Sequence, residues 1–280
     1  MKDFIRLTDL TKDDIFNIFS IADRISSGEY KGFLNEKTAV MFFPQSSIRT
    51  RVTFEKGIWL LGGQSILFPP ETLDKKEALC DVCGYLGNWA DVLIVRHKDI
   101  TKLEEMAEHS PVPVINGMTD FNHPCEILSD LYALSKMRED FTQDKYLFCG
   151  KNANIGMSWK EAASVLGLDL VQCCCEGCEM ADIPVYYDIY EAISGRDIVC
   201  TDSIPAYISD ESDECRVTRK AMDMANKGAV LNPCPPFFRN EEVSADAIDS
   251  VHFAGYSFKK HLLTVQQAII IYCMNGGAAL

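Results

Sequence analysis

Hydroxyl and guanidinium side chains alternate in one short segment, Ser47-Ile48-Arg49-Thr50-Arg51. An apolar run that stops at Pro44 precedes it, so a strand should end here and a helix should begin. Helix N-termini attract anions through unpaired N–H groups and the helix dipole, and arginine matches a phosphate with two parallel hydrogen bonds. An ordinary serine cap with surface arginines is the alternative, but two cations in a first helical turn oppose the dipole. The segment therefore predicts phosphate binding.

A second pair of residues is suited to polarising a carbonyl group. Arg96 directly follows the apolar run 92–95, and His123 stands directly before Pro124. Proline favours the first position of a helix, which leaves His123 at the N-terminal end. A histidine there resists protonation and can donate a neutral hydrogen bond to an oxygen that gains charge. A capping or core histidine is the alternative; Arg96 favours the functional interpretation because its strand should end at the same sheet edge.

Apolar, unbroken strands alternate with helices twice along the chain, a pattern typical of parallel sheets covered on both faces. We therefore predict an α/β protein with two doubly wound parallel sheets and a ligand at the carboxyl ends of the strands. The predicted strands are residues 38–43, 64–68, 92–95, 112–115, 146–149, 169–174, 197–200 and 229–231. The predicted helices are residues 9–25, 47–61, 75–87, 100–108, 124–136, 155–166, 189–194, 218–226 and 262–274.

Charge and composition narrow the class of protein. The chain has 27 Lys and Arg against 41 Asp and Glu, a formal net charge of -14, so nucleic acid and anionic membranes are poor partners. The first residues lack a secretory pattern, and no apolar run approaches the roughly 20 residues that span a bilayer. We expect a cytoplasmic protein without a membrane partner. Cys80 with Cys83, and Cys173–Cys175 with Cys178, could bind zinc, but apolar surroundings favour buried structural thiols and no metal.

These segments resemble the aspartate and ornithine carbamoyltransferase family. Ser47–Arg51 is similar to the family's Ser-Thr-Arg-Thr-Arg motif, and residues 114–126 are similar to its His-Pro-x-Gln segment. The similarity covers nearly the whole chain, and Leu61-Gly62-Gly63 with Asn116–Asp120 places it closer to the ornithine branch. The resemblance implies a carbamoyl phosphate domain (residues 1–140), an acceptor domain (141–260) and a C-terminal helix (261–280) that returns to the first domain.

The resemblance also implies which residues bind the donor. It assigns carbamoyl phosphate to Ser47, Ile48, Arg49, Thr50, Arg96, His123 and Glu126, with Arg96 and His123 catalytic. Two of these depart from the family pattern: Ile48 replaces a threonine, and Glu126 replaces a glutamine. A carboxylate beside an anionic donor is costly unless it is protonated, paired or turned away.

For the acceptor half, the resemblance implies a catalytic Cys234 and acceptor-binding roles for Asn154, Asp202, Lys260 and His261. Asp202 should follow a strand, where a carboxylate is well placed to bind an ammonium. The family's Ser-Met-Gly loop is absent, because residues 204–207 read Ile-Pro-Ala-Tyr, and Pro233 stands where the family has a histidine before the cysteine. The loop 150–156 also resembles a dinucleotide fingerprint, but its glycine spacing does not fit.

The predicted reaction is carbamoyl transfer from carbamoyl phosphate to an amine, with ornithine as first choice, giving citrulline and phosphate without a cofactor. Lys75 and Lys76 follow a loop that in this family reaches a neighbouring subunit, so the resemblance implies a homotrimer; a solvated surface is the alternative. Three other interpretations stay open: a different amine or amino acid as acceptor, a non-catalytic anion-binding homologue, and a nicotinamide-binding dehydrogenase.

Overall fold

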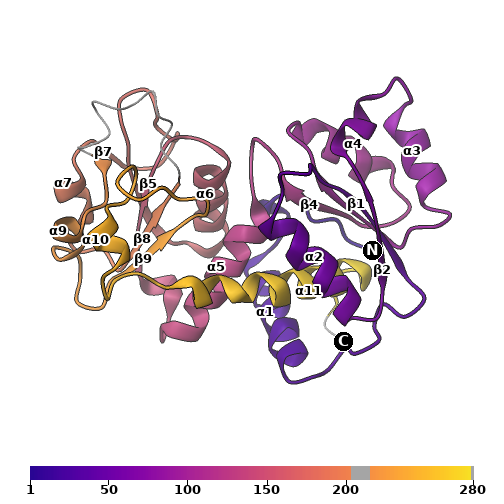
Figure 1. Ribbon diagram of the computed structural model, residues 1–280, viewed down its shortest axis with the longest axis horizontal. Helices are drawn as coiled ribbons and strands as arrows, with labels where there is room; N and C mark the ends of the chain where they lie inside the picture. The colour runs from indigo at the N-terminus through magenta and orange to yellow at the C-terminus, as the bar shows by residue number, and fades with distance from the viewer. Residues whose placement is uncertain (203–214, 279–280) are drawn as a thin grey trace. The chain divides into compact units, whose positions relative to one another are not determined.

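The structure is a computed structural model that describes residues 1–202 and 215–278 of the chain. The chain divides into two compact units. The first unit takes in residues 1–133 and the chain from Lys259 onward, and the second takes in residues 134–258. Each unit has its own parallel sheet with helices packed against it (Figure 1). The prediction of two parallel-sheet α/β units is therefore confirmed.

The sheet of the first unit has the strand order β2-β1-β3-β4, and every neighbouring pair is parallel. Its strands are β1 (Thr38–Phe42), β2 (Gln64–Phe68), β3 (Val92–Arg96) and β4 (Val114–Met118). The central strands β1 and β3 are almost wholly buried, as their apolar, β-branched sequences predict. The edge strand β2 is largely exposed.

The register of β3 and β4 shifts at the end where Arg96 lies. Val95 pairs with Asn116, but Arg96 pairs with Met118, so Gly117 is the extra residue of a bulge. A Cβ atom at Gly117 would lie 2.8 Å from the ring of Phe43, which explains why glycine occupies this position. Bulges change the direction of neighbouring side chains, and this one directly precedes the loop to His123.

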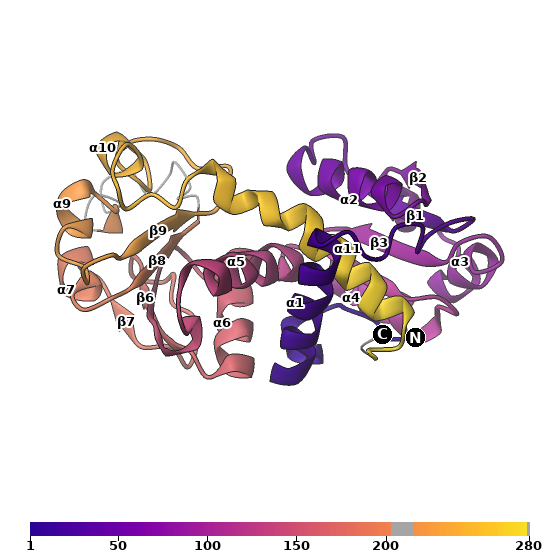
Figure 2. The same ribbon diagram turned by 90° about the horizontal axis from the view of Figure 1, so that it is seen from below.

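Helices of the first unit cover both faces of its sheet. They are α1 (Lys12–Ser26), α2 (Arg49–Leu60), α3 (Leu79–Leu86), α4 (Ile100–His109), the start of α5 (Pro124–Met137) and α11 (His261–Met274), with short 3-10 helices η1 (Leu7–Asp9) and η2 (Pro70–Asp74). Buried residues of α3 and α4 form one apolar cluster with β1, β3 and β4. The C-terminal helix α11 packs against α1 and α2, which confirms its predicted return to the first unit (Figure 2).

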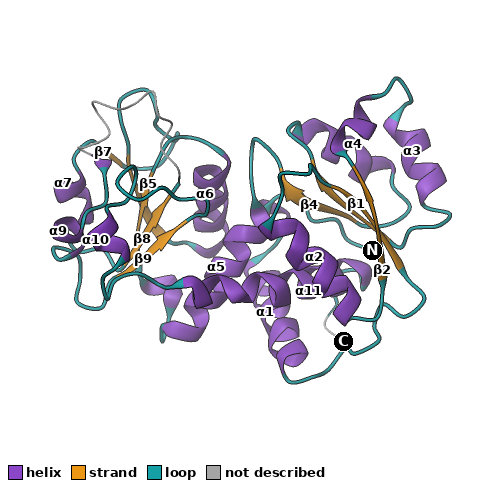
Figure 3. Ribbon diagram, viewed as in Figure 1, coloured by secondary structure: helices purple, strands orange, loops and turns teal. Residues whose placement is uncertain are grey.

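The second unit also has a sheet with helices packed around it (Figure 3). Its strand order is β7-β6-β5-β8-β9. Its strands are β5 (Lys145–Cys149), β6 (Asp169–Cys173), β7 (Val185–Tyr186), β8 (Ile198–Thr201) and β9 (Val230–Pro233). Its helices are the end of α5, η3 (Phe141–Gln143), α6 (Asn154–Leu166), α7 (Ile189–Ile193), α9 (Arg219–Met222) and α10 (Ala245–Ile248); η5 (Tyr256–Lys260) leads from it into α11. Strand order reverses around β5, between β6 and β8, where α/β proteins commonly bind ligands.

Several elements differ from the sequence prediction. The helix predicted from Lys75 begins at Leu79, because Lys75 and Ala78 are extended and residues 75–77 are exposed. Strand β7 and helix α10 were not predicted, since two and four residues are too short to show a periodic pattern. None of the helices within the described residues is both long and apolar enough to cross a bilayer.

Candidate active site

The predicted phosphate-binding turn lies at the carboxyl end of β1 and leads into α2. Helix α2 begins at Arg49 after Ile48, and no side chain within the described residues caps its first turn. Ser47 and Thr50 are buried, whereas Ile48 and Arg49 are exposed. The Nη1 atom of Arg96 donates a hydrogen bond to the hydroxyl oxygen of Ser47 over 3.1 Å. The structure therefore brings the turn and the end of β3 together.

The positive charge at this point is concentrated and partly buried. Burial, with repulsion from Arg49, lowers the pKa of the Arg96 guanidinium. Two arginines that repel each other are stabilised when an anion lies between or beside them. Helix N–H groups and arginine forks supply the donors that a phosphate needs. The arrangement fits a dianionic phosphate ester or anhydride.

His123 is buried directly before the first residue of α5. Burial, reinforced by the charges of Arg96, Lys259 and Arg49, lowers its pKa to about 4, although the nearby Glu126 opposes this shift. The imidazole is therefore neutral at neutral pH. A neutral imidazole can donate a hydrogen bond to a carbonyl oxygen as that oxygen gains charge.

Glu126 lies in the first turn of α5 and is also buried. Its Oε1 atom accepts a hydrogen bond from the ammonium of Lys259 over 2.9 Å. Burial is the largest single influence and raises the pKa of Glu126, but Lys259, His123 and Arg49 together outweigh it, and the net shift is downward. A carboxylate beside an anion site can be protonated, paired with a cation or turned away. In this chain Glu126 is paired with Lys259 and stays ionised.

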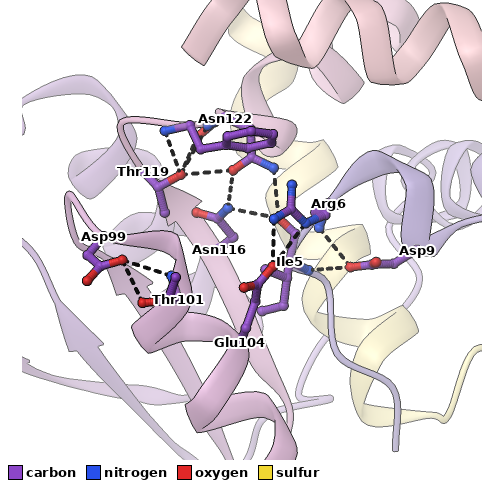
Figure 4. Close-up of polar contacts among 10 residues, drawn as sticks. Ile5, Arg6, Asp9, Asp99, Thr101, Glu104, Asn116, Thr119 and Asn122 are labelled. Carbon is purple, nitrogen blue, oxygen red and sulfur yellow. Dashed lines mark hydrogen bonds and ion pairs between the residues drawn. The ribbon is translucent and has the colours of Figure 1, made fainter. Parts of the chain in front are cut away.

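A buried polar network holds the loop that carries His123 (Figure 4). The side-chain amide nitrogen of Asn116, in the middle of β4, donates to the side-chain oxygen of Asn122 over 2.6 Å and to the backbone oxygen of Ile5 over 2.8 Å. The hydroxyl of Thr119 donates to the same Asn122 oxygen over 3.0 Å and accepts from the Asn122 backbone N–H. Asn116 and Asn122 are fully buried. The residue before His123 is thus fixed to three parts of the chain.

The N-terminal segment supports this loop from outside. The guanidinium of Arg6 lies 4.4 Å from the centre of the Phe121 ring and donates to Glu104 over 2.6 Å (Figure 4). The carboxylate of Asp9 accepts hydrogen bonds from the backbone N–H groups of Ile5 and Arg6. Because an arginine over an aromatic face adds cation–π attraction to its ion pair, the loop is held on its exposed side as well.

A cavity of about 280 Å³ opens beside Arg96. Its wall contains residues of both charge signs: Pro44, Pro70, Glu71, Asp74, Arg96, His97, Lys98, Met118, Thr119 and Asp120. The Asp99 backbone N–H donates to Nδ1 of His97 over 3.0 Å, which leaves the His97 proton on Nε2, 3.1 Å from an oxygen of Asp74. His97 therefore fastens η2 to the carboxyl end of the sheet.

In the second unit, three predicted acceptor-half residues lie at the carboxyl edge of its sheet. Asp202 follows β8, and its backbone N–H donates to Cys149 at the end of β5. Cys234 follows β9 and donates its backbone N–H to Thr201 over 3.0 Å. Asn154 is the first residue of α6, the helix after β5. Neighbouring parallel strands thus place all three along one edge.

The other two predicted acceptor residues belong to the first unit by their chain contacts. Lys260 is exposed at the start of α11, and the ring of His261 packs edge-on against Tyr132 with centroids 5.2 Å apart. The residues 204–207, where the family's loop is replaced, lie outside the described part of the chain. The predicted acceptor set therefore falls into two groups, one in each unit.

The cysteines are free thiols, and burial raises the pKa of Cys83 to about 11. Within the described residues no three His, Cys, Asp or Glu side chains gather as metal ligands. Cys83 and Cys173 lie in apolar clusters of their units, which accounts for them as small packing residues.

Asp130 and Asn122 were not predicted as site residues, and Lys259 was not predicted as the partner of Glu126. Asp130 follows Glu126 by four residues, so both carboxylates lie on one helix face, and two acidic residues at this spacing on a largely apolar helix indicate that a cation is needed. Lys259 lies 133 residues further along the chain, and only the tertiary fold shows that it is this cation. Asn122 carried no signal in the sequence.

Comparisons with known proteins agree along the whole chain. Residues 2–136 match the family described as aspartate/ornithine carbamoyltransferase, carbamoyl-P binding domain, and residues 142–273 match the Asp/Orn binding domain of the same family. The chain is 33% identical to an ornithine carbamoyltransferase of Campylobacter fetus, covering 98% of both chains. It is also similar to the solved ornithine carbamoyltransferase of Burkholderia thailandensis (TM-score 0.91, 26% identity, 99% and 100% covered) and the anabolic one of Campylobacter jejuni (TM-score 0.88, 28% identity, 99% and 100% covered).

The burial of His123 predicts a measurable protonation state. Its pKa of about 4 lies below the ordinary value of 6.5, so the ring should stay neutral as the pH falls from 7 to 5. Nitrogen-15 NMR of histidine-labelled protein, with His123→Gln identifying the signal, measures this directly. A His123 ring that gains its proton with a midpoint near pH 6.5 would contradict the electrostatic description of the site.

Proposed function

Since the chain belongs to the aspartate/ornithine carbamoyltransferase family and is a carbamoyltransferase, we propose that it transfers the carbamoyl group of carbamoyl phosphate to the side-chain amine of ornithine. The products are citrulline and phosphate. The observation that carries the proposal is the meeting of Ser47, Arg49, Arg96 and neutral His123 at one edge of the first sheet.

In the donor half, we assign the phosphate to Ser47, Arg49, Thr50 and the N–H groups that begin α2. The exposed Ile48 can contribute only its backbone, because its side chain has no polar atom. Arg96 and His123 polarise the carbamoyl oxygen, which gains negative charge as the amine attacks. Loss of one such preorganised donor typically costs roughly 10²–10³ in rate. Phosphate then leaves with the bridging oxygen, neutralised by the same arginines.

In the acceptor half, the edge of the second sheet supports binding of an amino acid. We assign the α-amino group to Asp202, the amino-acid end to Asn154, and a position beside the reacting amine to Cys234. The nearby carboxyl of Glu242 has a pKa that burial raises, with smaller contributions from repulsion by Glu241 and Asp202. An ammonium on Asp202 relieves that repulsion. The names of the relatives favour ornithine as this ligand.

The side-chain amine must lose its proton before it attacks. An amine of this type has a pKa of about 10.4 and is mostly charged at neutral pH. Only the unprotonated form is nucleophilic, so the rate should rise with pH through the neutral range. We assign residues 1–140 to the donor, 141–260 to the acceptor and 261–280 to the returning helix, and the cytoplasmic location stays a prediction.

Incubation with carbamoyl phosphate and a panel of amines tests the proposal. We expect citrulline and phosphate in equal amounts with ornithine, and a KM for ornithine raised at least about tenfold in Asp202→Asn, since a charged hydrogen bond is worth about 1.5–3 kcal/mol. Asp182→Asn is a matched control, because Asp182 is exposed, pairs only at the surface with Lys160 and has a φ of 61° that asparagine tolerates.

Other outcomes of this assay decide between the remaining interpretations. A ureido product from a different amine would replace ornithine as acceptor. Binding of phosphate without transfer to any amine would indicate the non-catalytic homologue. A KM for ornithine unchanged by Asp202→Asn would remove Asp202 from the acceptor site.

We also propose that three copies of the chain assemble. Large apolar side chains on α2 are exposed in the first unit, among them Val52 and Trp59 at 55% and 70% exposure. Exposed apolar groups on one helix are typical of an interface. Light scattering should give a mass near three times the 31.4 kDa of one chain. A strict monomer at all concentrations would contradict this assembly.

A further inference from the structure

Three charged side chains meet in the first unit where the sequence pattern of the family has an uncharged glutamine. The ammonium of Lys259 lies 2.9 Å from Oε1 of Glu126, and 2.7 and 2.8 Å from the two carboxylate oxygens of Asp130. The exposed fractions of the side chains are 7% for Glu126, 2% for Asp130 and 21% for Lys259. A lysine ammonium has three N–H donors, and three of the four oxygens of these two carboxylates lie within hydrogen-bond distance of it.

The two carboxylates need this cation. Glu126 and Asp130 lie four residues apart on α5, so their side chains are neighbours on one helix face and repel each other when both are charged. Buried carboxyl groups without a cation take up protons. Arg49 and His123 also lie near Glu126, and the Cys125 thiol on the same helix has a pKa that burial and the Glu126 charge raise. Lys259 is the group whose ammonium contacts both carboxylates.

We propose that Lys259 is a positioning residue for carbamoyl transfer, which holds Glu126 as an oriented carboxylate that accepts hydrogen bonds from the carbamoyl N–H groups of the donor. This inference rests on the proposed function. It explains how a carboxylate replaces a glutamine beside an anion: the added negative charge is balanced by Lys259 within hydrogen-bond distance. Lys259 itself touches neither reacting atom in this role.

The pair also determines which donor the site accepts. An ionised carboxylate has only acceptor atoms, so it favours a group with N–H donors and repels one with oxygen lone pairs or negative charge. The carbamoyl nitrogen carries two N–H bonds. An acyl phosphate with a methyl or carboxylate group in place of that nitrogen offers none. Glu126 held by Lys259 therefore selects for an amide-bearing phosphate, more strictly than a glutamine, which can also donate.

Binding of two donor analogues tests the selectivity without relying on catalysis. Phosphonoacetamide carries the amide, and phosphonoacetate carries a carboxylate in its place. By calorimetry we expect wild-type protein to prefer phosphonoacetamide by roughly 10²-fold, as a fully charged group facing a carboxylate is strongly disfavoured. The preference should fall at least about tenfold in both Glu126→Gln and Lys259→Met. In the first variant the side chain at position 126 is neutral, and in the second Glu126 takes up a proton. An unchanged preference in both variants would overturn the proposal.

Steady-state kinetics tests the positioning role. Lys259→Met should lower kcat/KM for carbamoyl phosphate by roughly 10–100-fold, the range of coupling between contacting charged residues. Removing the cation raises the Glu126 pKa, so the acid limb of the kcat/KM profile should move to higher pH. Lys259→Arg, which keeps the charge, should retain most activity and the wild-type limb. The effect of Lys259→Met on kcat/KM should be smaller in the Glu126→Gln background. Glu126→Gln should also lack the acid limb, because it has no carboxyl group at position 126.

Matched controls separate this role from folding and from the reaction itself. Lys12→Met changes an exposed lysine of α1 in the same unit and should alter neither selectivity nor rate. Circular dichroism and thermal unfolding report whether each variant folds, and Lys259→Arg covers the case in which Lys259→Met does not. Transfer to amines with an unshifted pH limb in Lys259→Met would refute the positioning role alone. Wild-type protein that keeps its amide preference but transfers no carbamoyl group would refute only the proposed function.

Discussion

The site depends on positive charge gathered at the edge of one parallel sheet within a chain of formal net charge -14. Arg49, Arg96 and Lys259 each lower the pKa of the buried His123. Lys259 and Arg49 also lower the pKa of Glu126 and so favour its ionised form. One electrostatic field therefore prepares a neutral hydrogen-bond donor and a charged acceptor a single helical turn apart.

The fold produces this field by ordinary means. Parallel strands end at a common edge, so β1 delivers Ser47 and α2, β3 delivers Arg96, and β4 leads to His123. The bulge at Gly117 and the buried amides of Asn116 and Asn122 then set the loop before α5. Such support is necessary because even a small displacement of a catalytic group removes much of its effect on the rate. In the second unit, the carboxyl edge of its own sheet likewise carries Asn154, Asp202 and Cys234.

The layered architecture could be predicted because its strands are short, apolar and buried on both sides, and the gathering of Ser47, Arg49, Arg96 and His123 follows from that architecture. The sequence shows that a carboxylate at Glu126 would be costly beside an anion, but it does not show which cation balances that charge. Lys259 reaches Glu126 through the return of the chain into α11, a tertiary contact that no local pattern encodes. Strand β7 was not predicted, and α3 was predicted to begin too early. Both errors arise because too few residues at these positions follow a periodic apolar pattern. The roles of the acceptor residues stay predictions, and residues 204–207, which replace the family's loop, lie outside the described chain.

The most direct measurement of the central claim is the affinity, by calorimetry, of a phosphonate that joins donor and ornithine in one molecule. If Arg49 and Arg96 bind a dianionic donor and the chain also binds ornithine, this compound should bind far more tightly than inorganic phosphate. Its affinity should fall by at least about tenfold in Arg96→Met, which removes a charged hydrogen bond of about 1.5–3 kcal/mol. Binding no tighter than that of phosphate, or binding indifferent to Arg96→Met, would contradict the account.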